Sequence, residues 1–360
     1  MKVVVSGMRP TGRLHLGNYW GALRNFINLQ NDYECYFFIA DLHALTTAND
    51  MKQRISENTF LMVADWLACG LNPEKCVIFR QSDIPAHYQL HLLLSMIVPL
   101  SWLLRNPTFK EQLIEIYEKK YKGQEDKAKR SVGSIRRIAE ASGMDDKTQD
   151  ALLSEIANYG FLGYPVLQSA DILLYDADFV PVGKDQLAHI EITRHVASRF
   201  NSIFKKEVFK QPQPLLTDTP VIPGIDGKKM SKSYGNTVDI GENGDSLKNK
   251  VMSMYTDPKK IRATDSGNPN GCVVYAFHRV YNPDYKNIEL DCKAARLGCV
   301  ACKKRLFEVL NPIMKGIDDK RRFYLENRDV VYDVIKSGND RALKKSGKKF
   351  DEVLSAIGLV

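Results

Sequence analysis

Two lysines three positions apart are the residues of this chain best suited to phosphate chemistry. They lie in the segment Lys229-Met230-Ser231-Lys232-Ser233, which glycines precede and follow. Two ammonium groups on a flexible stretch suit a polyphosphate whose charge changes during a reaction. A lysine-rich loop can equally be an ordinary solvated surface, so this segment predicts a phosphate site only together with a second signal.

A segment near the N-terminus supplies the second signal. Residues 2–7 predict a short buried strand, a Gly/Pro turn follows, and His15-Leu16-Gly17-Asn18 begins a helical pattern. This order presents backbone N–H groups and the positive end of a helix dipole to an anion. Gly17 also lets a flat base approach the backbone closely. A strand, turn and helix with a purely structural role is the alternative.

Together the two segments resemble the paired signatures of the class I aminoacyl-tRNA synthetases. His15 to Asn18 is similar to the HIGH motif, and Lys229 to Ser233 matches the KMSKS motif in full. The resemblance covers residues 1 to about 340. It implies an α/β fold, with a Rossmann-like doubly wound parallel sheet and a C-terminal α-helical tRNA-binding domain.

The amino-acid substrate is indicated by the stretch from Gly163 to Tyr175, which closely resembles the tryptophan site of the tryptophan-specific members. Indole carries one N–H donor on a large apolar body, so its site needs one acceptor and apolar walls. The resemblance makes Asp171 that acceptor, with a helix N-cap as the alternative role. The other tryptophan-binding residues that it implies are Tyr164, Gln168, His43, Val180, Val182, Gln186 and Val5. Tyrosine-specific members are the nearest alternative family.

The reaction that the resemblance implies has two steps and needs no side-chain nucleophile. The L-tryptophan carboxylate attacks the α-phosphorus of ATP, pyrophosphate leaves, and tRNA(Trp) then takes the tryptophanyl group. The predicted catalytic residues are Lys229, Lys232, His15 and Asn18. The predicted ATP-binding residues are Arg9, Pro10, Thr11, Gly17, Asn18, Gly183, Lys184, Asp185, Val221, Lys229, Met230, Ser231, Lys232 and Ser233. Mg²⁺ accompanies the ATP, held more by phosphates than by protein.

Arg9 departs from the family pattern, because many bacterial members have glutamine at this position. An arginine there adds a fixed positive charge beside the phosphates. A protein derived from a synthetase that senses tryptophan or RNA without charging is the alternative function. The intact residues His15, Asn18, Lys229 and Lys232 argue against it.

Composition agrees with an enzyme that binds nucleic acid. The 360 residues are 44% hydrophobic and carry a formal net charge of +8, which allows two domains and a tRNA partner. No apolar run approaches the roughly 20 residues of a membrane span, and the N-terminus predicts a strand rather than a signal sequence. We therefore expect a cytoplasmic protein, and the family resemblance implies a homodimer.

The elements that must position these residues alternate between strand and helix. Strands are expected at 35–40, 76–79, 163–167 and 179–183, and helices at 51–68, at 87–104 and from near His189. This alternation predicts a parallel sheet whose ligand lies beyond the carboxyl ends of the strands. The expected domains are a catalytic domain over 1–236, with a charged helical insertion at 107–158, and a helical anticodon-side domain over 237–360.

The seven cysteines divide into two groups. Cys35, Cys69 and Cys76 lie in apolar segments and predict small core residues. The other four, in the helical domain, have the spacing C-x19-C-x6-C-x2-C and are Cys272, Cys292, Cys299 and Cys302. Four thiols in a reducing compartment favour a metal over a disulfide. A subset of tryptophan-specific members is similar here and implies a [4Fe–4S] cluster, with zinc or unliganded thiols as alternatives.

Overall fold

The structure is a computed structural model, and it describes residues 1–46, 54–106, 109, 158–183, 186–216 and 222–360. The expected charged insertion at 107–158 lies outside the described residues, apart from its residues 109 and 158. Within the described part of the chain, no helix is long and apolar enough to cross a membrane.

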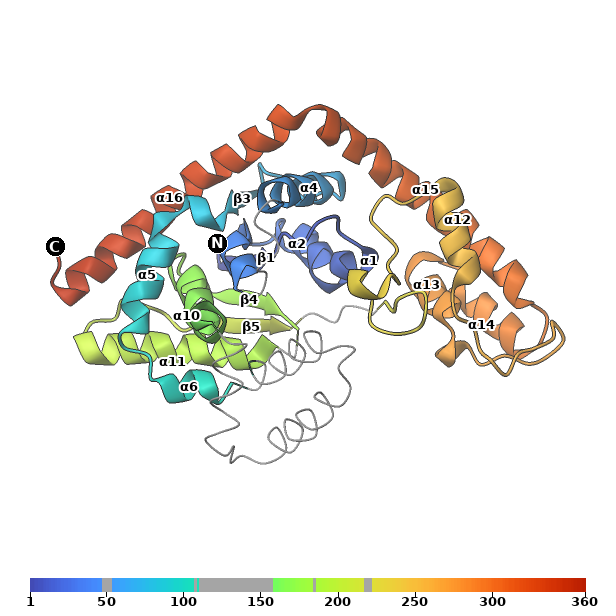
Figure 1. The fold of residues 1–360 in the computed structure, drawn as a ribbon, viewed down its shortest axis with the longest axis horizontal. Helices are drawn as coiled ribbons and strands as arrows, with labels where there is room; N and C mark the ends of the chain where they lie inside the picture. Colours follow the sequence, from blue (N-terminus) through green and yellow to red (C-terminus); the bar gives the residue numbers. More distant parts are fainter. Residues whose placement is uncertain (47–53, 107–108, 110–157, 184–185, 217–221) are drawn as a thin grey trace.

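A five-stranded parallel sheet forms the centre of the molecule (Figure 1). Its strands are β1 Val3–Met8, β2 Glu34–Ile39, β3 Cys76–Arg80, β4 Phe179–Val182 and β5 Gln213–Leu216. The spatial order is β3-β2-β1-β4-β5, so the direction of winding reverses between β1 and β4. This is the doubly wound arrangement that the sequence predicted, and in such sheets ligands bind at the reversal point.

Helices cover both faces of the sheet. The N-terminal helices are α1 Leu16–Asn18, the π-helical η1 Tyr19–Leu23, α2 Arg24–Leu29, α3 Asp41–Leu45, α4 Ile55–Ala68, the short η2 Gln81–Asp83, α5 Pro85–Ser95 and α6 Leu100–Leu104. The following helices are α10 Tyr159–Leu173, α11 Leu187–Phe204, η4 Lys232–Tyr234, α12 Gly244–Ser253, η5 Pro269–Gly271, α13 Val273–Tyr281, α14 Tyr285–Lys293, α15 Cys299–Glu326 and α16 Arg328–Ile357.

The alternation of buried side chains along the strands divides the core into two clusters. Val4, Phe37 and Ile78 belong to the cluster beneath α2, α4 and α15, whereas Val5 and Phe38 belong to the cluster beneath α5, α10 and α11. Both faces are therefore apolar, as a buried parallel sheet requires. Cys35 and Cys76 are 1% exposed and belong to the first cluster, which confirms their prediction as core residues.

The prediction of a strand at 163–167 is wrong, because these residues lie in helix α10. Asn158 caps this helix by accepting a hydrogen bond from the Phe161 N–H at 2.7 Å, and Pro165 lies inside it. A short apolar run is compatible with a buried strand or a buried helix, since both faces are covered in either case. Strand β5 was not predicted, because its residues include Pro214 and are largely polar or half-exposed.

The two long C-terminal helices form a bent arch over the sheet, with the bend at Asn327 (Figure 1). Helix α15 packs against α4, α12 and α13, and α16 crosses β3 and α5. At the crossing, a Cβ atom on Gly338 would lie 1.8 Å from the Ile78 carbonyl oxygen, so the helix can approach the strand this closely only with glycine. The C-terminal helix is thus part of the packing of the catalytic sheet.

Candidate active site

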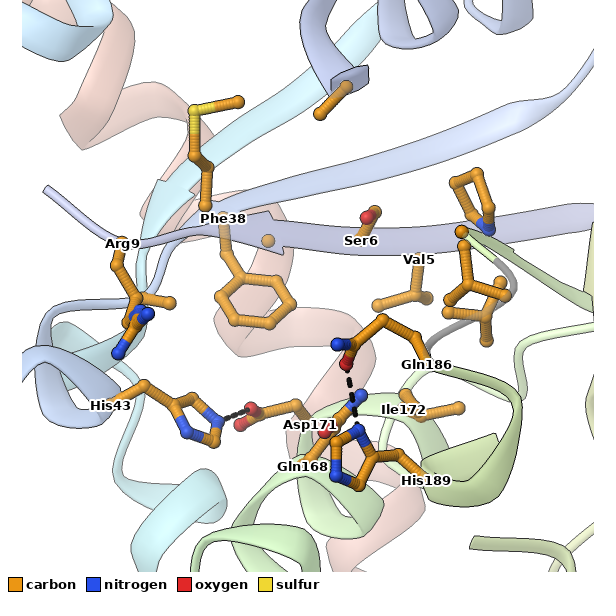
Figure 2. Close-up of a pocket in the computed structure, with 18 of the residues that line it drawn as sticks. Val5, Ser6, Arg9, Phe38, His43, Gln168, Asp171, Ile172, Gln186 and His189 are labelled. Atoms are coloured by element: carbon orange, nitrogen blue, oxygen red, sulfur yellow. Dashed lines mark hydrogen bonds and ion pairs between the residues drawn. The ribbon is translucent and has the colours of Figure 1, made fainter. Parts of the chain in front are cut away.

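A pocket of about 470 Å³ opens at the carboxyl ends of β1 and β4, where the winding of the sheet reverses (Figure 2). The volume lies within the range of small-molecule sites. All eight residues predicted to bind tryptophan line it: Val5, His43, Tyr164, Gln168, Asp171, Val180, Val182 and Gln186. Arg9 and Gly183, predicted to bind ATP, also line it. The tertiary structure therefore brings residues from four separate segments to one cavity.

Asp171, on α10, is the carboxylate of this pocket and is fully buried. Its Oδ2 accepts a hydrogen bond from His43 Nε2 at 2.8 Å, and its Oδ1 one from His87 Nδ1 at 2.5 Å. Gln81 Nε2 lies 2.8 and 2.9 Å from the two oxygens. Three side chains from α3, η2 and α5 thus converge on one carboxylate.

These partners decide the charge of Asp171. Burial by itself raises the pKa of this carboxyl, but hydrogen bonds from His43 and His87 outweigh the burial and hold the pKa well below its usual range. Asp171 is therefore an ionised acceptor in a pocket lined by both apolar and polar side chains. A helix N-cap, the alternative role, is excluded because Asp171 lies near the C-terminal end of α10.

A second hydrogen-bonded group fixes another part of the pocket wall. His189 is buried, and its Nδ1 lies 2.7 Å from Gln186 Oε1 (Figure 2). Its Nε2 lies 2.6 Å from the Tyr164 hydroxyl. The arrangement is satisfied when Nδ1 donates to Gln186 and Nε2 accepts from Tyr164. Burial raises the pKa of Tyr164 to about 12, so its hydroxyl stays protonated.

The N-terminal signature is organised by reciprocal capping. His15 Nδ1 accepts from the Asn18 N–H at 3.3 Å, and the Asn18 side-chain oxygen accepts from the His15 N–H at 3.1 Å. These bonds orient the start of α1 toward the lysine segment. Burial and the nearby charge of Lys232 lower the pKa of His15 to about 4, so it is neutral at physiological pH.

The lysine segment lies directly against this helix start. The Gly17 N–H donates to Met230 Sδ at 3.3 Å, and Lys232 Nζ donates to the Thr11 carbonyl oxygen at 2.9 Å. Met230 is buried, whereas Lys229 and Lys232 are exposed. The segment is therefore attached through Met230 and through the Lys232 ammonium group, whereas Lys229 is exposed. Two sequence signals more than 200 residues apart form one corner of the molecule.

Three predicted ATP-binding residues lie outside the described part of the chain: Lys184, Asp185 and Val221. The backbone of Ser233 is in the short helix η4. Pro10 is buried, and the side chain of Thr11 is exposed. The remaining predicted residues lie at the pocket or at the corner described above.

Sequence reasoning missed several residues that support the site residues through hydrogen bonds without lining the pocket. Gln81 and His87 contact Asp171, and Asn236 organises the lysine segment through bonds to the Ser231 N–H and the Lys229 carbonyl. Gln81 follows the end of strand β3, and a polar residue at that edge of a parallel sheet was a usable signal. His87 carried no comparable signal, because it lies inside a helix far in sequence from the predicted site residues. Asn236 follows the lysine segment by three residues, but its residue type alone did not mark it as part of the site.

The four cysteines of the helical region lie around one cavity. Cys272 precedes α13, Cys292 lies in α14, and Cys299 and Cys302 lie in the first turn of α15. All four line one small cavity, of about 20 Å³, and a Cβ on Gly267 would lie 2.6 Å from Cys292 Sγ. Among the described residues, no three His, Cys, Asp or Glu side chains form a group already spaced to hold a metal ion. Four thiols are chemically suited to bind a metal ion or cluster as thiolates. Here they surround a small cavity and are not all close to one shared point.

Comparisons with known proteins agree with this geometry. The family described as tRNA synthetases class I (W and Y) matches residues 1–315. The tryptophan–tRNA ligase of Aquifex aeolicus (strain VF5) is 40% identical over 396 residues, covering 99% of both chains. The ligase of Thermotoga maritima (strain ATCC 43589) is 40% identical over 361 residues, again covering 99% of both.

Solved structures give the same result. Tryptophanyl-tRNA synthetase from Campylobacter jejuni, complexed with ADP and tryptophan, superimposes with a TM-score of 0.79 at 28% identity, covering 99% of this chain and 100% of that one. Tyrosyl-tRNA synthetase from Archaeoglobus fulgidus, with a TM-score of 0.61 and 18% identity, shares the fold alone. The chain belongs to the class I tRNA synthetases of tryptophan and tyrosine. Within that family its function is that of a tryptophan–tRNA ligase, which uses ATP as a substrate.

Proposed function

We propose that the pocket residues divide the ligase reaction between a rigid tryptophan site and a mobile phosphate site. Asp171 accepts the indole N–H, and Val5, Val180 and Val182 contact its ring. Tyr164, Gln168, His43 and Gln186 surround the remaining polar atoms of the amino acid. The observation that carries this proposal is an ionised, fully buried carboxylate at the winding reversal of a Rossmann-like sheet.

For activation, the tryptophan carboxylate attacks the α-phosphorus of ATP and pyrophosphate leaves. Lys229 and Lys232 bind the β- and γ-phosphates, and neutral His15 and Asn18 position them without adding charge. Arg9 lines the same pocket and supplies a further fixed charge. Gly17 and Met230 pack beside the adenine. Catalysis is then positioning and charge stabilisation, because the carboxylate is already a nucleophile.

Amino-acid-dependent exchange of pyrophosphate into ATP, measured with all twenty amino acids, tests this assignment. Tryptophan should support exchange and tyrosine should not, since the proposed pocket places Asp171 to accept from an indole N–H rather than from a phenolic hydroxyl. Exchange supported by tyrosine, or by none of the twenty amino acids, would overturn the proposal. Charging of tRNA(Trp) transcripts then tests the second step.

We also propose that residues 237–360 contact tRNA on the anticodon side, while 1–236 hold the catalytic site. The basic clusters on α15 and α16 support this in part, since Lys304, Arg305 and Lys320 are exposed. Arg321 and Lys349 have structural partners instead: Arg321 pairs with Asp65, and Lys349 with Asp176 and Glu352. Replacing the exposed lysines should weaken tRNA charging without changing pyrophosphate exchange. A tryptophan–tRNA ligase works where translation occurs, which supports a cytoplasmic location.

The homodimer remains part of the proposal, and helix α5 supports it. Tyr88, Leu92 and Met96 lie four residues apart along one face of this helix and are all exposed. Tyr159 continues the stripe, because its ring contacts His91 of α5. Such a contiguous apolar face on a soluble enzyme indicates a protein interface. Replacing Leu92 and Met96 by glutamate should produce monomers in sedimentation experiments, whereas Leu359→Glu, at an equally exposed site, should not.

The four cysteines are proposed to hold a [4Fe–4S] cluster, with zinc as the alternative. Cys272, Cys292, Cys299 and Cys302 would supply its thiolates, and the bound group would order the ends of α13, α14 and α15. Protein purified without oxygen should be brown and contain about four irons per chain. Cys299→Ser should lose the colour and Cys69→Ala should keep it. Colourless protein with one zinc would reject the cluster.

A further inference from the structure

Behind Asp171, on the side away from the pocket, three more buried side chains continue its hydrogen bonds. His87 Nδ1 contacts Asp171 Oδ1, and His87 Nε2 lies 2.8 Å from the Tyr175 hydroxyl. The side chain of Ser346 lies beside the Tyr175 hydroxyl. All four side chains are at most 1% exposed. None of His87, Tyr175 and Ser346 lines the tryptophan pocket.

The carboxylate of Asp171, at one end of this series, determines the direction of the first hydrogen bond. An ionised Asp171 can only accept, so His87 Nδ1 must carry a hydrogen. His87 Nε2 lies 2.8 Å from the Tyr175 hydroxyl, which donates to it when Nε2 carries no hydrogen. Ser346 lies at the end of the series, and its Oγ donates to the Leu343 carbonyl oxygen at 3.4 Å. Burial, followed by the charge of Asp171, raises the pKa of Tyr175 well above its usual value, so Tyr175 keeps its proton.

Helix α16 supplies the last member of the series and is fixed nearby by independent contacts. Asn339 accepts from the Arg80 N–H at 3.0 Å and donates to Asp83 at 2.6 Å, at the two ends of η2. Together with the close approach of Gly338 to β3, these bonds set the position of α16 against the segment that contains Gln81. The C-terminal helix therefore supports Asp171 through both His87 and η2.

We propose that His87, whose second ring nitrogen is held by the Tyr175 hydroxyl, is a positioning residue that fixes Asp171 for recognition of the indole N–H. The proposal rests on the proposed role of Asp171 as the indole acceptor. His43 also contacts Asp171, but it lines the pocket, so the substrate can displace or rearrange it (Figure 2). His87 lies on the closed side, where both of its ring nitrogens have protein partners.

Removing the Tyr175 hydroxyl tests the proposal without touching the pocket. In Tyr175→Phe, His87 Nε2 loses its partner, so the ring is held only through its contact with Asp171 and its orientation is less fixed. We expect the KM for tryptophan to rise about tenfold, because a less fixed His87 weakens one hydrogen bond to the charged Asp171, with the KM for ATP unchanged. Ser346→Ala should raise it less, about two- to threefold, because Tyr175 can still donate to His87.

A change in ligand selectivity separates positioning from a general structural role. The benzothiophene analogue of tryptophan, β-(3-benzothienyl)alanine, has sulfur in place of the indole N–H and cannot donate to Asp171. Tyr175→Phe should therefore reduce the preference for tryptophan over this analogue, as measured by pyrophosphate exchange. An equal loss of activity with both ligands would overturn the proposal, because it would indicate only a looser fold.

Tyr36→Phe is the matched control. Its ring packs 4.8 Å from that of Tyr175, but its hydroxyl donates to Glu34 and belongs to neither the series nor the pocket. It should leave the selectivity unchanged. Among His87 variants, His87→Asn can keep a donor in the place of Nδ1 and should retain more selectivity than His87→Leu. Equal behaviour of these two variants would also contradict a positioning role.

Asp171→Asn distinguishes failure of this proposal from failure of the proposed site. If Asp171 accepts the indole N–H, this change must reduce the preference for tryptophan over the analogue. A reduction in Asp171→Asn without one in Tyr175→Phe would reject His87 as a positioning residue and keep Asp171. No reduction in either variant would reject the indole site itself.

Discussion

The tryptophan half and the phosphate half of the active site differ in how firmly they are built. Asp171 is fully buried and receives hydrogen bonds from three side chains on three elements. Lys229 and Lys232 are exposed, and their segment is attached chiefly through Met230 and Asn236. One half is complete before its ligand arrives, and the other presents charges that can move.

The difference follows from what each half must do. Discrimination between similar amino acids requires buried polar groups that a wrong ligand leaves unpaired, so the acceptor must already be fixed. Stabilising a leaving pyrophosphate requires charges that act most strongly when the transition state forms. Rigid construction serves the first task, and an exposed loop with long cationic side chains serves the second.

Replacing both lysines should impair the phosphate half of the active site and leave the tryptophan half intact. Lys229→Ala combined with Lys232→Ala should lower the rate of adenylate formation about 10³-fold, close to 4 kcal/mol, because the leaving phosphates lose their countercharge. Stopped-flow measurement of activation and calorimetric titration of tryptophan would separate the two halves. Equal losses in activation and in tryptophan binding would remove the distinction drawn between them.

The phosphate half also rests on a buried ion pair, which an Arg321 variant would test. Asp65 accepts from the Leu14 N–H, next to His15, and pairs with Arg321 of α15 at 2.6 Å, both being buried. Arg321→Met should lower the free energy of unfolding by about 3 kcal/mol, since it leaves a buried carboxylate unpaired. Arg322→Met is the neighbouring control: its side chain is 65% exposed, and the loss should stay below about 0.5 kcal/mol.

Chemical denaturation of both variants gives the comparison. If Arg321→Met and Arg322→Met were equally stable, α15 would not anchor the N-terminal signature. Adding Asp65→Asn to Arg321→Met should recover part of the lost stability, because the unpaired charge is then gone.

Neutralising the fixed acceptor should break the tryptophan half. Asp171→Asn should weaken tryptophan binding about 100-fold, or roughly 2.7 kcal/mol, since it removes a charged acceptor and changes the bonds from His43 and His87. The affinity for ATP should remain within about twofold. Equilibrium binding of each ligand checks this expectation. A parallel loss of ATP binding would indicate that the two halves are coupled more tightly than the structure implies.

A pH dependence from His15 is the most gradual effect expected, because it is spread over more than two pH units. Its folded pKa of about 4 lies below the ordinary value of 6.5, so the unfolded chain binds the proton more readily. His15 therefore contributes stability that is fully present above pH 6.5 and is lost as pH falls toward 4, by at most about 1.4 kcal/mol per pH unit. His15→Asn keeps a capping side chain and lacks this titration. Identical slopes of unfolding free energy against pH, in the two proteins, would contradict the low pKa.

Local pattern was enough to predict the fold, and the family resemblance predicted part of the lining of the site. Buried strands such as Val3–Met8 and Glu34–Ile39 followed from their apolar runs, and the doubly wound order followed from their alternation with helices. The eight residues predicted to bind tryptophan came from segments that resemble the family, and all eight line the pocket. The helix at 163–167 was mistaken for a strand, since an apolar run buried on all sides has no distinguishing period.

The sequence by itself determined which groups could do chemistry: two lysines, a histidine, a carboxylate and four thiols at defined spacings. The tertiary structure alone decided their partners. His87, Tyr175 and Ser346 come from three helical or post-helical positions up to 259 residues apart, and nothing local marks them as neighbours of Asp171. The physical reason is that a buried carboxylate must find donors wherever the packed core brings them, and packing depends on the whole chain.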